Sequence, residues 1–260
     1  MRFGLGVAMS LCVVRAVSAV ALAQSSPAGG GYLAGHEPDT IAVVPQAPTP
    51  GSARDLEDRA VFKATRALEG SPRWALAQND VDLRIPSILH DFSCAAGVTL
   101  TEQDAPALIT ILRKLYPDLQ SAYGGPKDLY RRPRPYLRDS GPICTPRSKA
   151  LDESFDYPSG HATFAWTYGL ILAELLPDRA GPILQRARAF GESRAVCGVH
   201  SASAVTEART AASTLFAALQ ASPAFQEDLR SARAQLATIR ETPEPAACRA
   251  EQALTARTPW

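Results

Sequence analysis

The sequence predicts an all-α protein, a compact domain of several packed helices. Three observations indicate this fold. Apolar residues recur at helical spacing over most of the chain after residue 56, and no alternating strand pattern of useful length appears. Ser-Pro pairs, which suit the cap and first turn of a helix, stand at two of the expected helix starts. The chain has 260 residues and is 46% hydrophobic, which is enough to bury a core.

Residues 1–23 have the pattern of a signal peptide. Arg2 precedes an apolar run over residues 3–14, and Ala21-Leu22-Ala23 places small residues at the minus-three and minus-one positions of a cleavage site. A membrane anchor is the alternative, but the run is shorter than the ~18 residues needed to span a bilayer. We therefore expect cleavage after Ala23 and a periplasmic or secreted protein without stable membrane insertion.

Residues 24–55 are rich in Ser, Gly and Pro and lack periodicity, which predicts an extended N-terminal arm. The helical domain then spans residues 56–260. Its first helix begins at Leu56 and directs Phe62 and Leu68 toward the core, and Gly70 suits its end. Ser71-Pro72 starts a second helix.

A third helix begins near Asp104 and Pro106, with apolar residues at helical spacing. A fourth runs over residues 159–175, and its apolar length, broken by Glu174 and Pro177, suits a buried core helix.

Two further helices cover residues 183–195 and 199–219, and Ser222-Pro223 starts the last one. Most of the remaining Gly and Pro lie in expected loops between residues 122 and 157.

Charge and cysteine content narrow the function. The chain has 27 Lys and Arg against 26 Asp and Glu, which argues against a nucleic-acid partner.

Cys12 leaves with the signal peptide, and four cysteines remain. Four cysteines in an oxidising compartment allow three pairings, of which we favour Cys94 with Cys144 and Cys197 with Cys248. Four separate buried thiols are the alternative.

Candidate site residues lie between positions 127 and 200. Lys127 and Arg134 stand seven residues apart, which would place them two helical turns apart on one face, and by themselves they are typical of a solvated basic surface. Pro158-Ser159-Gly160-His161 directly precedes an apolar helix, whose free N–H groups suit a phosphate oxygen. An ordinary serine cap followed by a histidine is the alternative for this segment. Ser193-Arg194 and then His200 form the third piece, in which arginine can hold two phosphate oxygens.

The three pieces together resemble the signature of the phosphatidic acid phosphatase type 2 superfamily, Lys-x6-Arg-Pro, Pro-Ser-Gly-His and Ser-Arg-x5-His-x3-Asp. Strings around Cys94, Cys144 and Cys197, and residues 70–82, look like the class A bacterial nonspecific acid phosphatases. This resemblance implies a helical fold of the acid phosphatase/vanadium haloperoxidase type. It also implies a metal-independent enzyme without a cofactor that hydrolyses small phosphomonoesters and binds inorganic phosphate, and it makes a homodimer plausible.

The resemblance also implies a role for each site residue. Lys127, Arg134 and Arg194 would hold the equatorial phosphoryl oxygens, where charge must be stabilised during transfer. Ser159 and the Gly160 backbone would add further donors. His200 would attack phosphorus to form a phosphohistidine, and His161 would protonate the leaving alcohol and then activate water.

One position departs from the signature, because Ala204 stands where its final Asp is due. That Asp would accept a hydrogen bond from His200 Nδ1, so its absence predicts slow turnover and a gain of activity in Ala204→Asp. We expect a hydrolase with reduced activity. A phosphate-binding pseudoenzyme with little turnover is the alternative, and a vanadium haloperoxidase is a more distant third.

Overall fold

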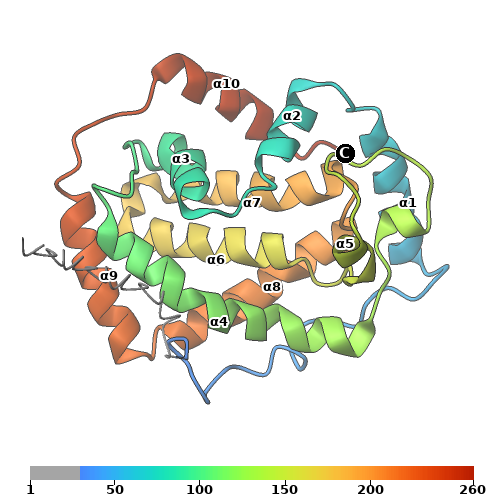
Figure 1. Cartoon of the computed structure of the whole chain (residues 1–260), viewed down its shortest axis with the longest axis horizontal. Coiled ribbons are helices and arrows are strands. Elements are labelled where there is room, and N and C mark those ends of the chain that lie inside the picture. Colours follow the sequence, from blue (N-terminus) through green and yellow to red (C-terminus); the bar gives the residue numbers. More distant parts are fainter. Residues whose placement is uncertain (1–29) are drawn as a thin grey trace, which may run out of the picture.

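The structure is a computed structural model that describes residues 30–260, so the predicted signal peptide lies outside it. The described residues contain ten α-helices, two short 3-10 helices and no strand, which confirms the predicted all-α fold (Figure 1). The α-helices are α1 (Ala53–Arg66), α2 (Pro72–Asn79), α3 (Ile85–Ala96), α4 (Pro106–Tyr130), α5 (Lys149–Glu153), α6 (Gly160–Leu175), α7 (Ala180–Val196), α8 (Ala202–Leu219), α9 (Pro223–Leu236) and α10 (Pro245–Thr255), and the 3-10 helices are η1 (Pro135–Leu137) and η2 (Pro177–Arg179).

Helix α6 is the centre of the molecule. It is apolar on all sides, as a helix surrounded by protein must be, and it packs mainly against α7 and α8 (Figure 1). The main core cluster joins α6 to α3, α4, α7 and α9 through aromatic contacts such as the edge-to-face pair of Phe92 and Tyr168. None of the helices in residues 30–260 is both long and apolar enough to cross a membrane.

The serine caps follow the local sequence. Ser71 and Ser222 accept hydrogen bonds from Trp74 N and Phe225 N, so α2 and α9 begin where the sequence predicts. Helix α1 begins at Ala53, three residues before the expected start, because Ser52 caps it. Sequence reasoning missed α3, which has no capping side chain, and α10, whose only buried residue is Thr255.

The expected loop over residues 122–157 is wrong in its first part, and the rest of the range contains the short helices η1 and α5. Helix α4 continues to Tyr130 although Pro126 removes one backbone donor, because Leu115, Leu119 and Ala122 extend its buried face. The helix ends where Arg131 takes a left-handed φ of 46°. Lys127 and Arg134 therefore do not share a helix face.

The two disulfides join Cys94 to Cys248 and Cys144 to Cys197, so the favoured pairing is wrong. Helices α3 and α10 pack together, which brings the first pair into reach across 154 residues. A backbone hydrogen bond from Cys144 N to Cys197 O aligns the second pair.

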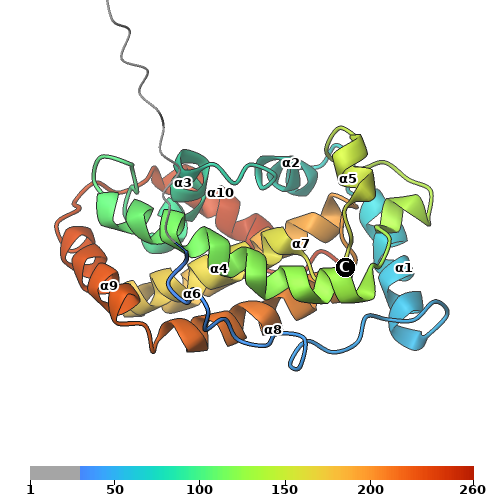
Figure 2. The same cartoon turned by 60° about the horizontal axis from the view of Figure 1, so that its bottom comes forward.

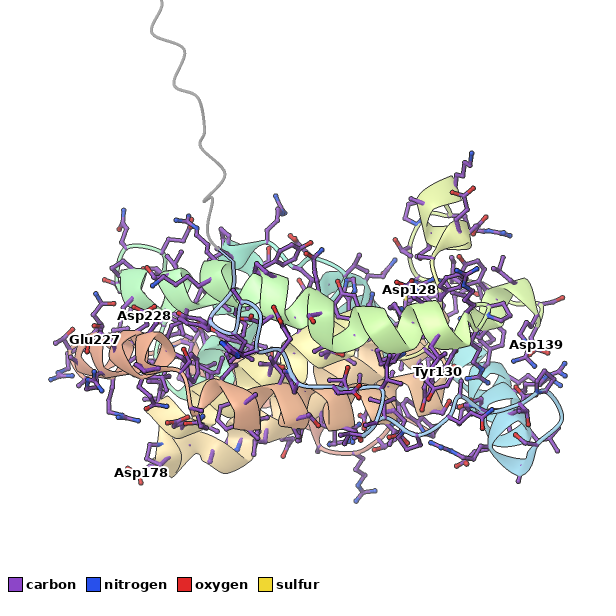
Figure 3. All side chains as sticks on the ribbon, turned by 90° about the horizontal axis from the view of Figure 1, so that it is seen from below. Asp128, Tyr130, Asp139, Asp178, Glu227 and Asp228 are labelled. Atoms are coloured by element: carbon purple, nitrogen blue, oxygen red, sulfur yellow. A yellow bond between two sulfur atoms is a disulfide. The ribbon has the colours of Figure 1, made fainter. Side chains whose placement is uncertain are left out.

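The N-terminal segment 30–52 forms turns and runs along α4 and α8 to α1 (Figure 2). Asp118 on α4 accepts hydrogen bonds from the backbone N–H groups of Tyr32 and Leu33, and the Tyr32 hydroxyl donates to Asp228. Asp228 lies at one end of the molecule, and Asp128 and Asp139 lie at the other (Figure 3). Asp128 follows Lys127, so the candidate site belongs to this second end.

Candidate active site

The packing of α6, α7 and α8 brings the pieces of the motif to one place. Helices α6 and α7 are neighbours that run in opposite directions, so the first turn of α6 lies beside the last turn of α7. Ala162, Ala195 and Val205 form a small buried cluster where these two ends meet the start of α8. Gly191 permits this approach, because a Cβ there would lie 3.2 Å from the Ala162 Cβ. His161 directly precedes Ala162, Arg194 directly precedes Ala195, and His200 lies between α7 and α8. The packing of these ends therefore brings the three residues to one place.

Lys127 enters the site from the last turn of α4. Its Nζ donates a hydrogen bond to the carbonyl oxygen of Phe155. Burial and the nearby Arg134 guanidinium lower the pKa of Lys127 to about 7, while Asp156 opposes the shift. This lysine lies close to other cations.

Arg134 lies directly beside His200. Its Nη1 is 3.0 Å from His200 Nε2 and donates to Val199 O at 2.6 Å. The other side of the guanidinium donates to the Ser154 hydroxyl at 2.8 Å. Arg134 is only 6% exposed, which contradicts the solvated basic surface that its sequence context alone suggested. Burial lowers its pKa.

Residues 159–161 form the N-terminus of α6. The Ser159 hydroxyl accepts a hydrogen bond from Ala162 N as the helix cap and keeps its own proton for donation. The first N–H groups of a helix have no partner within it and suit an anion. A Cβ on residue 160 would lie 3.2–3.4 Å from the ring of Tyr123, so a glycine fits here best.

His161 follows in the first turn, and its Nε2 lies 3.2 Å from Val81 O. Burial lowers the pKa of His161 to about 3, and the positive charges of Arg194, Arg134 and Lys127 contribute to this shift. The ring is therefore neutral above that pH while no anion is bound.

Arg194 is fully enclosed in the last turn of α7. Its Nη2 donates to Ala77 O at 2.6 Å, and among the described residues no acceptor lies within hydrogen-bonding distance of its buried Nε. Burial lowers its pKa to about 10. Ser193 before it is fixed by Asp80, which accepts its hydroxyl proton at 2.5 Å. A buried arginine with an unused donor favours an anionic ligand.

His200 precedes α8, whose N-cap is Ser201, and is 4% exposed. Its Nδ1 lies 2.6 Å from Asp156 O and 3.2 Å from Asp156 Oδ1. A carbonyl oxygen only accepts, so Nδ1 carries the hydrogen and Nε2 presents its lone pair toward Arg134. Burial holds the pKa of His200 well below its ordinary value, and Arg134, Lys127 and His161 lower it further. This neutral tautomer is the form that a nucleophile needs.

The expectation that His200 Nδ1 lacks a carboxylate is therefore wrong. Asp156 supplies one from the loop before α6, whereas Ala204 lies in an apolar cluster with Val44 and Tyr157. The Ser203 hydroxyl donates to Asp58 instead of contacting His200. Sequence reasoning did not select Asp156, although an acidic residue two positions before the Pro158-Ser159-Gly160-His161 segment is a visible signal.

All seven predicted site residues thus lie at one end of the molecule, and the three cations and two histidines share one feature. Each has a pKa below its ordinary value, first because it is buried. Lys127, His161, Arg194 and His200 also lie close enough to a neighbouring cation for positive charge to lower their pKa values. For Arg134 burial is the cause, and its carboxylate neighbours oppose the shift. An anion placed among these groups would supply the missing countercharge. Within residues 30–260, no group of three His, Cys, Asp or Glu side chains could hold a metal ion.

Comparisons with known proteins bear on the family of the chain. A model of the PAP2 superfamily matches residues 107–225, which include every predicted site residue. An acid phosphatase of Zymomonas mobilis is 39% identical over 218 residues, covering 82% of this chain and 83% of the relative. Non-specific acid phosphatases of Providencia stuartii and Salmonella typhimurium are 33% and 34% identical, covering 78% and 73% of this chain and 83% and 77% of the relatives.

Proposed function

The chain belongs to the PAP2 superfamily, among the bacterial non-specific acid phosphatases, and from this we propose that it hydrolyses small phosphomonoesters through a phosphohistidine on His200. The observation that carries the proposal is the contact between His200 and its neighbours. Nδ1 donates to Asp156, and the Nε2 lone pair faces a buried arginine. This arrangement suits an attack on a phosphoryl group held by that arginine.

The phosphoryl group would bind among Lys127, Arg134 and Arg194, with the Ser159 hydroxyl and the Gly160 N–H as further donors. Arg134 Nη1 would give up its contact with Nε2 and turn to a phosphoryl oxygen. Three positive charges then face the oxygens on which negative charge is spread during transfer. We propose that these cations make a metal and a cofactor unnecessary.

Two steps complete the reaction. His200 Nε2 forms a bond to phosphorus as the bond from phosphorus to the ester oxygen breaks, and His161 protonates the leaving alcohol. His161 then takes a proton from water, which attacks phosphorus and releases phosphate and neutral His200. Bound phosphoryl charge raises the pKa of His161, because it offsets the cations that lower that pKa in the free protein.

The pseudoenzyme alternative rested on a histidine without its carboxylate. Because Asp156 contacts His200 Nδ1, that ground for reduced turnover is absent, and no other observation favours a binding protein over a hydrolase. Reduced activity stays a prediction of the sequence alone. The signal peptide, the periplasmic or secreted location and the homodimer also stay predictions.

The proposal is tested by hydrolysis of a chromogenic phosphomonoester at mildly acidic pH. We expect turnover that EDTA leaves intact, inhibition by phosphate, and an acid-labile phosphoryl group on His200 after rapid quenching and peptide mass spectrometry. Turnover that is lost on chelation and restored by one added metal would contradict the mechanism. A phosphoryl group on another residue would contradict the assignment of His200.

The pH dependence tests Lys127. Its pKa of about 7 in the free protein means that the site holds this positive charge below that pH and loses it as the pH rises. We therefore expect kcat/KM, which reports the free enzyme, to fall above about pH 7. In Lys127→Arg the charge persists, so the falling limb should move to higher pH.

The profile is measured from about pH 4 to about pH 9, with Lys149→Arg as the control. Lys149 lies on α5 with an exposed side chain that pairs with Glu153, so the control should keep the wild-type limb. If the falling limb of the profile is unchanged in Lys127→Arg, the group whose titration produces that limb is not Lys127.

A further inference from the structure

We propose that Asp156 is the positioning residue for His200 and performs the task of the carboxylate that is missing at position 204. The inference rests on the proposed function, since it assigns the group that supports the nucleophile. Asp156 comes from the loop before α6, and His200 lies 44 residues later, before α8.

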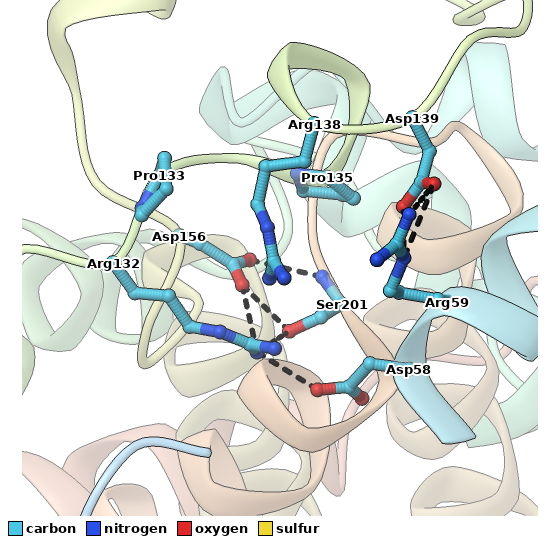
Figure 4. Close-up of a pocket in the computed structure, with 9 residues that line it drawn as sticks. All are labelled: Asp58, Arg59, Arg132, Pro133, Pro135, Arg138, Asp139, Asp156 and Ser201. Carbon is cyan, nitrogen blue, oxygen red and sulfur yellow. Dashed lines mark hydrogen bonds and ion pairs between the residues drawn. The ribbon is translucent and has the colours of Figure 1, made fainter. Parts of the chain in front are cut away.

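Both oxygens of the Asp156 carboxylate accept hydrogen bonds. Its Oδ1 accepts a hydrogen bond from Ser201 N at 2.9 Å, and its Oδ2 accepts one from the Ser201 hydroxyl at 2.6 Å. Arg132 Nη1 lies 3.2 Å from Oδ2 (Figure 4). The side chain is 1% exposed, so these contacts fix its orientation toward His200 Nδ1.

Arg132 provides the positive charge that a buried carboxylate needs. It is 5% exposed and contacts three carboxylates, those of Asp55 at 3.0 Å, Asp58 at 2.8 Å and Asp156 at 3.2 Å. Arg138 adds a second cation on Asp55 at 2.7 Å. A buried carboxylate without such partners would be costly and would become protonated instead. Asp55, Asp58 and Asp156 thus surround Arg132 in one charged cluster, and of these three carboxylates only that of Asp156 contacts His200.

The two contacts from Asp156 have different effects. Its backbone carbonyl, 2.6 Å from Nδ1, is sufficient to fix the tautomer. Its carboxylate, at 3.2 Å, adds negative charge that stabilises the positive charge growing on the ring as the bond to phosphorus forms. Loss of the charge alone should cost less than the ~10⁴-fold seen when a serine protease histidine takes the wrong tautomer.

Position 204 does not need a carboxylate in this protein. The Nδ1 hydrogen already has two acceptors on Asp156. The Ala204 side chain packs with Val44 and Tyr157, and its carbonyl accepts a hydrogen bond from Ser159 N at 3.0 Å. Ala204→Asp alone should therefore bring no gain in turnover.

The test compares Asp156→Asn with Asp58→Asn in the full protein. Asp58 is the matched control, because it belongs to the same Arg132 cluster and contacts Ser203 but not His200. We expect Asp156→Asn to lower kcat by about 10–100-fold while KM and inhibition by phosphate stay near wild type, since the cations are untouched. Asp58→Asn should leave kcat close to wild type. Equal kcat in the two variants would overturn the proposal.

Rescue gives the second measurement. Adding Ala204→Asp to Asp156→Asn restores a carboxylate at the position that the superfamily signature assigns to one, so kcat should rise by about tenfold, whereas Ala204→Asp alone should not raise it. A gain of about tenfold in the single variant would overturn the proposal, and this comparison holds even if Asp156→Asn does not fold.

A binding measurement separates this proposal from the proposed function. Sulfate needs only the cations, whereas vanadate also accepts a bond from His200 Nε2. Asp156→Asn should weaken vanadate by about tenfold and leave sulfate unchanged. If the wild-type protein shows no turnover and Asp156→Asn still weakens vanadate alone, the hydrolase is rejected and the role of Asp156 is kept. Equal weakening of both anions would reject the role of Asp156.

Discussion

Replacing His200 with alanine should lower kcat/KM for a phosphomonoester at least about 10⁴-fold, or roughly 5 kcal/mol of transition-state stabilisation. The variant loses the atom that forms the bond to phosphorus, and the alanine side chain has no group that can replace it. Lys127, Arg134 and Arg194 remain, so inhibition by inorganic phosphate should persist. The loss should appear in kcat, measured with the same chromogenic ester.

His161→Ala is the informative comparison. If His161 protonates the leaving alcohol, its loss should be large for an alkyl phosphate and small for an ester whose leaving group needs no proton. His200→Ala should be equally damaging with both esters. His90→Ala replaces an exposed histidine and should keep the wild-type turnover. It controls for differences between protein preparations. Appreciable turnover in His200→Ala would contradict the phosphohistidine mechanism.

Replacing Arg132 with methionine should reduce the free energy of unfolding by about 3–5 kcal/mol. The guanidinium is buried and pairs with Asp55, Asp58 and Asp156, so its removal leaves buried carboxylates without their shared countercharge. Arg138 still faces Asp55, which leaves Asp58 and Asp156 most affected. Urea unfolding followed by circular dichroism measures the loss.

Arg59→Met is the matched control for this result. Arg59 also pairs with an aspartate, Asp139, in the same region (Figure 4), but its side chain is 42% exposed. The Asp139 side chain is 7% exposed, but only this one carboxylate loses its partner and water reaches the Arg59 end of the pair, so this variant should lose less stability. Equal losses in the two variants would show that Arg132 is not the main countercharge of the buried cluster.

Features that depend on neighbouring residues along the chain could be predicted from the sequence. Helical periodicity predicts the all-α fold, and Ser71-Pro72 and Ser222-Pro223 mark two helix starts because a cap and a first-turn proline act within one turn. The site residues could also be predicted from the sequence, because the spacing of Lys127, Arg134 and the later pieces resembles a known signature. The structure places these residues together.

Contacts between residues far apart in the chain depend on how the helices and loops pack. The sequence allowed three disulfide pairings, and the packing of α3 against α10 selected Cys94 with Cys248. Arg132 stands in an arginine-rich stretch with Arg131 and Arg134, and α1 and the loop before α6 surround it with carboxylates.

The partner of His200 shows the physical reason most clearly. Reading along the chain leads to Ala204, one helical turn away, and to the conclusion that the carboxylate is missing. The packing of the loop before α6 against the start of α8 instead brings Asp156 to Nδ1 from 44 residues away. Local sequence fixes helix starts because their hydrogen bonds are local, whereas the support of a buried histidine depends on whichever element the core packs beside it.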